Sequence, residues 1–311
     1  MQEYISQKEL KTIENLEFFA RQVVEGFITG LHKSPYHGFS VEFAEHRLYN
    51  SGESTRHIDW KLFARTDKLF VKRFEEETNL RCQLVIDRSS SMHFPVQKKL
   101  TAQAPNKIGF SILAAAALMN LFKRQRDAVG LSVFSDKVQI HTRTRTSAAH
   151  HKRLLWELES LAEPFNEKIK ESTNAVEALH EIADRIHQRS LVVLFSDLLG
   201  TQEHAEDLFS ALQHLKYNKH EVIVFHVIDR ARELNFDFDP RMHKFVDLET
   251  GEELKVNPVE LQDEYVKQMS VFEQELKVRC GHYKIDFVPV DCTQGFEQVL
   301  LSYLLKRKKL Y

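Results

Sequence analysis

From residue 80 onward, the sequence alternates short apolar runs with longer segments of helical periodicity, and this alternation restricts the fold more than any other feature. The apolar runs lie at residues 82–86, 128–134, 191–195, 222–228 and 285–290, and residues 138–141 resemble a short edge strand that follows a hairpin turn at 135–137. Helical periodicity is found at residues 106–125, 147–162, 174–189, 202–217, 258–280 and 292–307. Strands that alternate with helices of this length favour a mostly parallel sheet with helices on both faces. We therefore expect an α/β, doubly wound fold.

The part of the chain before residue 80 has a different pattern. Residues 8–30 carry apolar side chains at helical spacing, which predicts an amphipathic helix. Residues 33–79 are polar, aromatic and rich in turn formers, with one predicted strand at 69–74. We therefore expect an N-terminal helix and short β segment, residues 1–79, that packs on a main domain formed by residues 80–311.

One stretch interrupts the alternation inside the main domain. Residues 245–256 combine two strand-like runs with a turn near Thr250 and Gly251, which is typical of a β-hairpin. We expect this hairpin, within residues 230–257, to be an excursion from the sheet.

The composition is that of a globular protein and excludes several classes. Hydrophobic residues make up 42% of the chain, and 43 basic residues against 45 acidic ones leave a net charge of −2. This balance gives no electrostatic reason to expect a nucleic-acid partner. The longest apolar stretch, around residues 112–119, falls well short of the ~20 residues that span a bilayer. With three scattered cysteines and no signal-peptide pattern, we expect a cytoplasmic monomer with reduced thiols and no membrane span.

Polar fragments lie at three places that a doubly wound sheet brings to one edge. Asp87, Ser89 and Ser91 follow the first predicted strand, and Asp197 follows the fourth. Thr173 immediately precedes the helix that leads into the fourth strand. In the common strand order 3-2-1-4-5-6, the first and fourth strands are neighbours, and ligands bind beyond their carboxyl ends. We therefore expect these five side chains to gather around one point.

The residue types at this point suit a hard divalent cation. Mg²⁺ prefers oxygen ligands at ~2.0–2.1 Å and usually keeps several waters. The hydroxyls of Ser89, Ser91 and Thr173 and the carboxylates of Asp87 and Asp197, bound directly or through water, supply such oxygens. At least one position stays open, and an acidic residue of a partner protein suits it. We expect Mg²⁺, with Mn²⁺ and Ca²⁺ as alternatives.

These fragments carry a first resemblance. Asp-x-Ser-x-Ser after the first strand, then a Thr, then an Asp after a later strand resembles the metal ion-dependent adhesion site of von Willebrand factor A domains. The resemblance covers roughly residues 80–311. It implies a von Willebrand factor A-like fold and a metal site formed by the five residues above.

A second resemblance covers the preceding region. The segments at residues 38–43, 47–49, 52–60, 64–65 and 69–73 together resemble domain-of-unknown-function family fifty-eight. That family carries an A-type domain and is commonly associated with MoxR-type AAA+ ATPases. The resemblance implies a non-catalytic adaptor that binds such an ATPase.

Two alternatives stay open for the acidic residues. Asp87 and Asp197 also suit the caps of helices that follow strands. The enzymatic alternative is a metal-dependent phosphohydrolase with Asp87 as its nucleophile. Such an enzyme needs an acid two residues later to protonate the leaving group, and Ser89 is a poor proton donor. We therefore expect a protein that binds rather than catalyses.

A dense polar and aromatic cluster lies before the main domain. It consists of Arg56, Asp59, Trp60 and Arg65. Trp and Arg are favoured anchors of protein interfaces, so the cluster suits a docking surface. Internal pairing of its charges is the alternative, and it is favoured because buried charges are usually paired.

Overall fold

The computed structural model describes residues 16–32, 46–48, 60–72, 80–97, 101, 104–163, 175–199 and 205–310. The described residues fall into two compact units. Residues 16–27 belong with 80–310 to the larger unit, and the smaller unit lies within residues 28–79.

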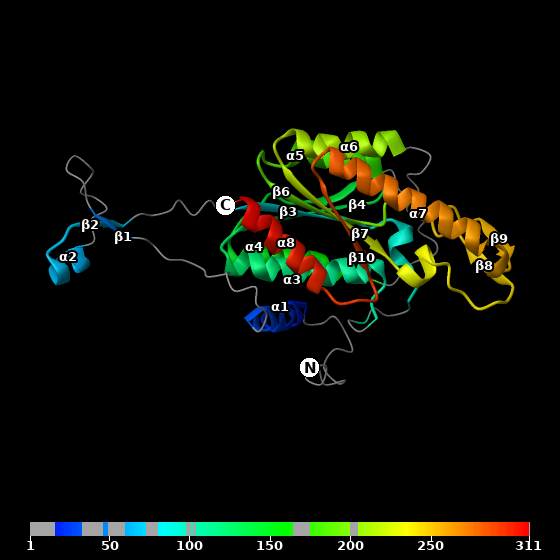
Figure 1. Ribbon diagram of the computed structural model, residues 1–311, viewed down its shortest axis with the longest axis horizontal. Helices are drawn as coiled ribbons and strands as arrows, with labels where there is room; N and C mark the ends of the chain where they lie inside the picture. The colour runs from blue at the N-terminus through cyan, green and yellow to red at the C-terminus, as the bar shows by residue number, and fades with distance from the viewer. Residues whose placement is uncertain are drawn as a thin grey trace. The chain divides into compact units, whose positions relative to one another are not determined.

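The larger unit is built on a six-stranded sheet with the order β10-β7-β6-β3-β4-β5 (Figure 1). Its strands are β3 (Arg81–Asp87), β4 (Ala128–Phe134), β5 (Val138–His141), β6 (Leu191–Ser196), β7 (Glu221–Ile228) and β10 (Asp286–Asp291). All neighbours are parallel except β4 and β5, which form an antiparallel edge. Numbered along the chain, this is the predicted order 3-2-1-4-5-6. The expected α/β, doubly wound fold is therefore confirmed.

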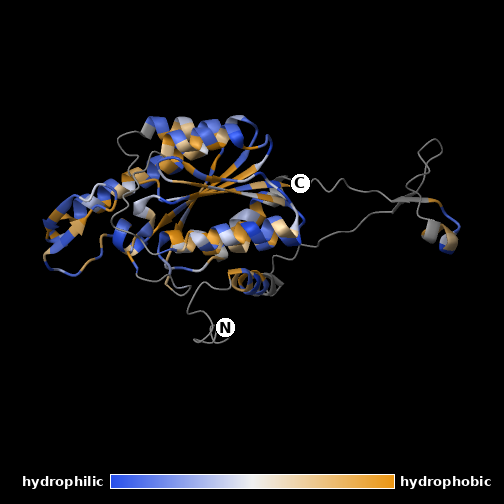
Figure 2. Ribbon diagram, turned by 180° about the vertical axis from the view of Figure 1, so that it is seen from behind, coloured by the Kyte–Doolittle hydropathy of each residue, from blue (hydrophilic) through white to orange (hydrophobic). Residues whose placement is uncertain are grey.

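Helices cover both faces of this sheet, as Figure 1 shows. One layer contains α3 (Lys107–Arg124), α4 (Ala148–Ser160) and α8 (Glu297–Leu310). The other contains α5 (Ala175–Arg185), α6 (Ala205–Tyr217) and α7 (Pro258–His282). Because both faces are covered, the strands are apolar almost throughout, which Figure 2 shows as an orange sheet between amphipathic helices.

Helix α3 lies closest to the centre of the larger unit. Every residue from Lys107 to Met119 is buried. Four consecutive alanines, residues 114–117, add little side-chain bulk and favour the helix strongly, so the backbone can approach the sheet closely. The helix begins at Asn106, whose side chain accepts a hydrogen bond from the Gly109 amide at 2.9 Å. This cap fixes the position of Lys107 at the carboxyl edge of the sheet.

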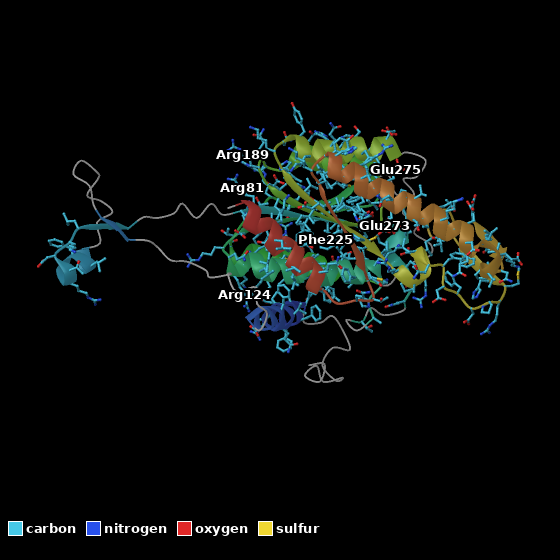
Figure 3. All side chains as sticks on the ribbon, viewed as in Figure 1. Arg81, Arg124, Arg189, Phe225, Glu273 and Glu275 are labelled. Atoms are coloured by element: carbon cyan, nitrogen blue, oxygen red, sulfur yellow. The ribbon has the colours of Figure 1, made fainter. Side chains whose placement is uncertain are left out.

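The first helix, α1 (Leu16–His32), contacts the larger unit through its initial turns. Leu16, Phe19 and Val24 are buried, and the Phe19 ring packs edge-on against Phe296 at a centroid distance of 5.8 Å. Arg124, labelled in Figure 3, forms an ion pair of 2.9 Å with Glu25. The helical periodicity predicted for residues 8–30 therefore continues to His32, while residues 8–15 lie outside the described part.

The smaller unit contains a short antiparallel pair, β1 (His46–Leu48) and β2 (Phe70–Lys72). Strand β2 corresponds to the strand predicted at 69–74. Between the two strands lies a helix that the sequence pattern did not predict, α2 (Trp60–Thr66). At seven residues it is too short to show a clear helical period in a polar, aromatic segment.

The predicted hairpin is present and follows a π-helical turn, η4 (Arg230–Leu234). Strands β8 (His243–Val246) and β9 (Glu253–Val256) pair antiparallel, and Gly251 at the turn has a positive φ of 76°. That conformation favours glycine. Phe236 packs on both Phe245 and Tyr265, so the hairpin is held to the first half of α7 by an aromatic cluster. Figure 1 shows the hairpin and this half of α7 projecting beyond the sheet.

The structure also bears on the cysteines and on the length of the apolar helices. Cys82, Cys280 and Cys292 are all buried free thiols. In the described part of the chain, we find no helix whose length and apolar content would let it cross a membrane.

Candidate functional site

Asp87 ends strand β3, and its side chain is fully buried at the carboxyl edge of the sheet. Its Oδ1 atom accepts a hydrogen bond from the Ser89 amide at 2.9 Å. Its Oδ2 atom accepts one from the Ser196 hydroxyl at 2.6 Å. Since β3 and β6 are parallel neighbours, Ser196 at the end of β6 comes directly beside Asp87. The adjacent strand therefore fixes the orientation of this carboxylate.

The hydroxyls of Ser89 and Ser91 face one another beside Asp87. Their Oγ atoms lie 3.0 Å apart. The Ser89 carbonyl accepts the Met92 amide at 3.1 Å, which turns the chain into a short 3₁₀ helix, η2 (Ser90–His93). Two adjacent oxygen ligands of an octahedral Mg²⁺, each at ~2.1 Å from the ion, are about 3 Å apart. The serine pair has this spacing.

Asp197 follows β6 and is also buried. Its Oδ1 atom accepts the Leu199 amide at 3.1 Å, and its backbone carbonyl accepts His226 Nε2 at 2.8 Å. Its Oδ2 atom accepts a hydrogen bond from the Lys107 ammonium at 2.6 Å. The second carboxylate of the predicted site is thus already paired with a protein cation.

Lys107 is fully buried and forms ion pairs with two carboxylates, Asp197 and Glu233. Burial alone lowers the pKa of Lys107, but the charges of Asp197 and Glu233 outweigh burial and raise this pKa above its ordinary value. Glu233 lies on η4, and its Oε2 atom accepts the Asp229 amide at 2.7 Å. The protonated lysine therefore joins the carboxyl edge of the sheet to the segment that leads into the hairpin.

The environment of Asp87 disfavours its ionised form, and this appears in its pKa. Burial first, and the nearby charge of Asp197 second, raise the pKa of Asp87 to about 7, although hydrogen bonds from Ser196 and Ser89 oppose this shift. Burial also lowers the pKa of His226 to about 4, so this imidazole is neutral and relieves none of the charge. A cation beside Asp87 would stabilise its ionised form.

The structure brings four of the five predicted site residues to one edge of the sheet. These residues are Asp87, Ser89, Ser91 and Asp197. Thr173 lies outside the described residues. Asp87 and Asp197 each also accept the backbone amide two residues later, so both carboxylates hold the turn that follows their strand. Asp87 does not cap the helix that follows it, because the N-cap of η2 is Ser89.

Sequence reasoning missed Lys107 and Glu233. A signal for Lys107 was present, because it heads an uninterrupted apolar helix and a lysine buried there needs a negative partner. Glu233 gave no such signal, since its segment was predicted as part of the hairpin excursion.

The donor set fits a hard cation and not a softer one. Across the described residues, no three His, Cys, Asp or Glu side chains form a group that could hold a metal ion. The fit depends instead on the serine hydroxyls: Ser89 and Ser91 have the spacing of adjacent ligands, and beside them lies Asp87, a buried carboxyl group whose ionised form a cation would stabilise. Asp197 is paired with Lys107 and is therefore less available to a metal ion.

The polar and aromatic cluster before the main domain is described only in part. Arg65 is an exposed residue near the end of α2. Arg56, Asp59 and the Trp60 side chain lie outside the described part. The choice between a docking surface and internal pairing therefore stays a sequence-based prediction.

Comparison with known proteins identifies a family and distant structural neighbours. The family described as "Protein of unknown function DUF58" matches residues 45–275. The uncharacterized proteins Rv1480 of Mycobacterium tuberculosis and Mb1516 of Mycobacterium bovis are each 25% identical over 217 residues, which is 70% of this chain. The match spans 64% of the length of these relatives.

Solved structures with a similar fold are more distant in sequence. The hypothetical protein BatB from Bacteroides thetaiotaomicron is 15% identical, with a TM-score of 0.43, over 75% of this chain and 100% of its own. The SpRpn10 VWA domain is 10% identical, with a TM-score of 0.38, over 72% of this chain and 94% of its own. TM-scores this low do not support an argument from these structures. The description of the fold and of the site therefore depends only on the strand order and the side-chain contacts of this chain.

Proposed function

Because this chain belongs to the DUF58 family, whose function is unknown, we propose a function from its site. We propose that the protein is a non-catalytic adaptor that binds an acidic residue of a partner protein through a Mg²⁺ ion at the carboxyl edge of the sheet. Mn²⁺ and Ca²⁺ are the alternative ions. The resemblance of the sequence to an adhesion-type metal site supports the same proposal.

The observation that carries this proposal is the pair of serine hydroxyls beside Asp87. Ser89 and Ser91 are the residues that would hold the ion directly, because their oxygens have the separation of adjacent ligands. Asp87 would contribute negative charge next to them, and Ser196 keeps its carboxylate oriented. When bound, the ion supplies an electrophilic position for an outside carboxylate oxygen.

Lys107 supports recognition of an acidic group. Its ammonium group compensates Asp197 and Glu233, so these two carboxylates present less negative charge to an approaching anion. A site with hydroxyl ligands and a neutralised second carboxylate leaves a bound cation more electrophilic than a site with several directly bound carboxylates.

The exposed apolar surface of the hairpin supports a protein partner rather than a small molecule. The hairpin and the first turn of α7, residues 242–261, are here called the hairpin arm. Large apolar side chains on this arm are 40% to 70% exposed: Met242, Val246, Leu254, Val259 and Leu261. Several exposed apolar side chains within one short segment of the chain are typical of protein interaction surfaces. The arm follows η4, which carries Glu233 into the site.

The enzymatic alternative is disfavoured by the environment of Asp87. A nucleophilic carboxylate needs access to substrate, but Asp87 is fully buried and both of its oxygens accept hydrogen bonds. Ser89 stands where a phosphohydrolase of this type would need its general acid. A phosphatase panel with Mg²⁺ or Mn²⁺ tests this alternative: turnover that is lost in Asp87→Asn would favour the enzyme.

The partner proposed is a MoxR-type AAA+ ATPase, and the support for it is the family resemblance. We propose that the adaptor works in the cytoplasm as a monomer. A pulldown with the untagged ATPase, in Mg²⁺ buffer and in buffer with chelator, tests both the partner and the metal. Equal capture in the two buffers would contradict metal-dependent binding.

The direct test of the ion is calorimetric titration of Mg²⁺. The wild-type protein is expected to release binding heat, and a Ser89→Ala, Ser91→Ala double variant is expected to lose it. Ser270→Ala is the matched control, because this serine lies exposed on α7, far along the chain from the site. Equal heats from the wild type and the double variant would refute the proposed site.

A further inference from the structure

We propose that His180 and His214 form a second metal site, separate from the carboxyl edge of the sheet, which takes a late transition-metal ion such as Ni²⁺ or Cu²⁺. The two histidines lie on the outer helices α5 and α6. Their Nδ1 atoms face one another at 2.9 Å, and their ring centroids are 5.1 Å apart. Neither histidine has a role in the function proposed above.

The distance between the two nitrogens is that of adjacent metal ligands. Imidazole nitrogens bind metal ions at ~2.0–2.1 Å, so two of them at a right angle about one ion are about 2.9 Å apart. A right angle is the arrangement of neighbouring ligands in the square-planar or octahedral sites of Cu²⁺ and Ni²⁺, and both ions favour imidazole. A tetrahedral ion such as Zn²⁺ would require the two rings to move apart.

Asp184 favours the form of His214 that binds metal. Its Oδ1 atom lies 3.3 Å from His214 Nε2. A carboxylate beside Nε2 favours the tautomer that carries the proton on that nitrogen, which leaves the lone pair of Nδ1 available to a metal ion. This pairing of a carboxylate with the outer nitrogen of a ligating histidine recurs in metal sites, where it orients the ring and raises its basicity.

The site is reachable from solvent and open to further ligands. The His214 side chain is 29% exposed, and Asp184 is 72% exposed. Only two side chains bind the ion directly, which agrees with the finding that the described residues hold no group of three or more suitable side chains. Waters or a ligand from another molecule would fill the remaining positions. A bound ion would link α5 to α6.

The experiment uses the untagged protein in the Ser89→Ala, Ser91→Ala background, which removes the direct ligands proposed for Mg²⁺ and so separates the two sites. Ni²⁺ and Cu²⁺ are titrated separately, and the melting temperature is recorded with and without each ion. The background protein is expected to bind one ion tightly and to melt at a higher temperature with it. His180→Gln and His214→Gln are each expected to weaken binding at least tenfold and to abolish the rise in melting temperature.

A matched control and a spectroscopic measurement make the outcome specific. His282→Gln removes an exposed histidine at the end of α7 and is expected to leave binding unchanged. Electron paramagnetic resonance of the Cu²⁺ complex is expected to show two coordinated nitrogens, reduced to one in His180→Gln. Binding that is unchanged in both site variants would overturn the proposal, and so would a spectrum without nitrogen ligands. Either result would leave the two rings as a simple hydrogen-bonded pair.

Discussion

Lys107 Nζ lies 2.6 Å from Asp197 Oδ2, and this buried ion pair joins the first turn of α3 to the end of β6. The same ammonium contacts Glu233 on η4. One fully buried cation thus connects three elements that meet at the carboxyl edge of the sheet.

Replacing Lys107 with Met should destabilise the protein strongly. The change keeps the length of the side chain but leaves Asp197 and Glu233 without their cation, and removing one partner of a buried pair costs about 3–5 kcal/mol. Urea unfolding monitored by circular dichroism measures this loss. Lys123→Met is the control, because its ion pair with Glu17 is about half exposed and such pairs contribute ~1 kcal/mol or less. Similar losses in the two variants would contradict the importance of burial.

Ser196→Ala should destabilise the protein by about 1–3 kcal/mol, since it removes the donor to buried Asp87 and the acceptor for the Leu198 amide. Ser160→Ala is the matched control: its hydroxyl donates to the Glu157 carbonyl on an exposed face of α4, where the loss should stay within ~0.5 kcal/mol. Both are measured as midpoints of urea unfolding. If the two midpoints fall equally, Ser196 does not hold the Asp87 carboxylate.

The sequence predicted the sheet well because each strand carries its own signal. Strands β4 and β5 have the predicted limits, residues 128–134 and 138–141, since an apolar run is followed by a turn and then by a short segment that alternates apolar and polar residues. The ion pairs of Lys107 could not be predicted in this way. They join residues 90 and 126 positions apart, and no local pattern states which side chains meet at that distance.

The same distinction between local signals and long-range contacts applies to the candidate site. Asp87, Ser89, Ser91 and Asp197 were predictable because each follows a strand and the doubly wound order makes the two strands neighbours. The donation from Ser196 to Asp87 depends on the register between β3 and β6, which the strand limits alone do not fix.

Gly130→Ala should destabilise the sheet although the added side chain is small. A Cβ atom at this position would collide with Gln83 Oε1 and would lie 2.7 Å from the Thr142 carbonyl oxygen. Because the latter belongs to the backbone, the strand itself must shift, and overpacking of this kind typically costs about 1–3 kcal/mol.

The control for this substitution is Gly26→Ala. Gly26 lies inside helix α1 with open space around its Cβ position, so alanine should stabilise the helix by about 0.5–1 kcal/mol. Thermal unfolding of the two variants should therefore shift in opposite directions. A Gly130→Ala protein as stable as the wild type would show that β4 can move away from Thr142.

His220 should make the stability of the protein depend on pH. Its side chain is fully buried, its Nδ1 atom accepts the Ser190 amide at 3.1 Å, and burial lowers its pKa below the ordinary value. Below the unfolded-state pKa of ~6.5, the unfolded chain binds a proton that the folded protein does not, so the free energy of unfolding falls as the pH falls. One such group contributes a slope of at most about 1.4 kcal/mol per pH unit.

In His220→Asn, an amide oxygen can still accept from Ser190, but the titrating group is gone. Urea unfolding at pH 7.5 and pH 5.5 should therefore show a smaller difference for His220→Asn than for the wild type, whereas exposed His282→Gln should keep the full difference. An unchanged difference in His220→Asn would mean that other groups cause the acid sensitivity.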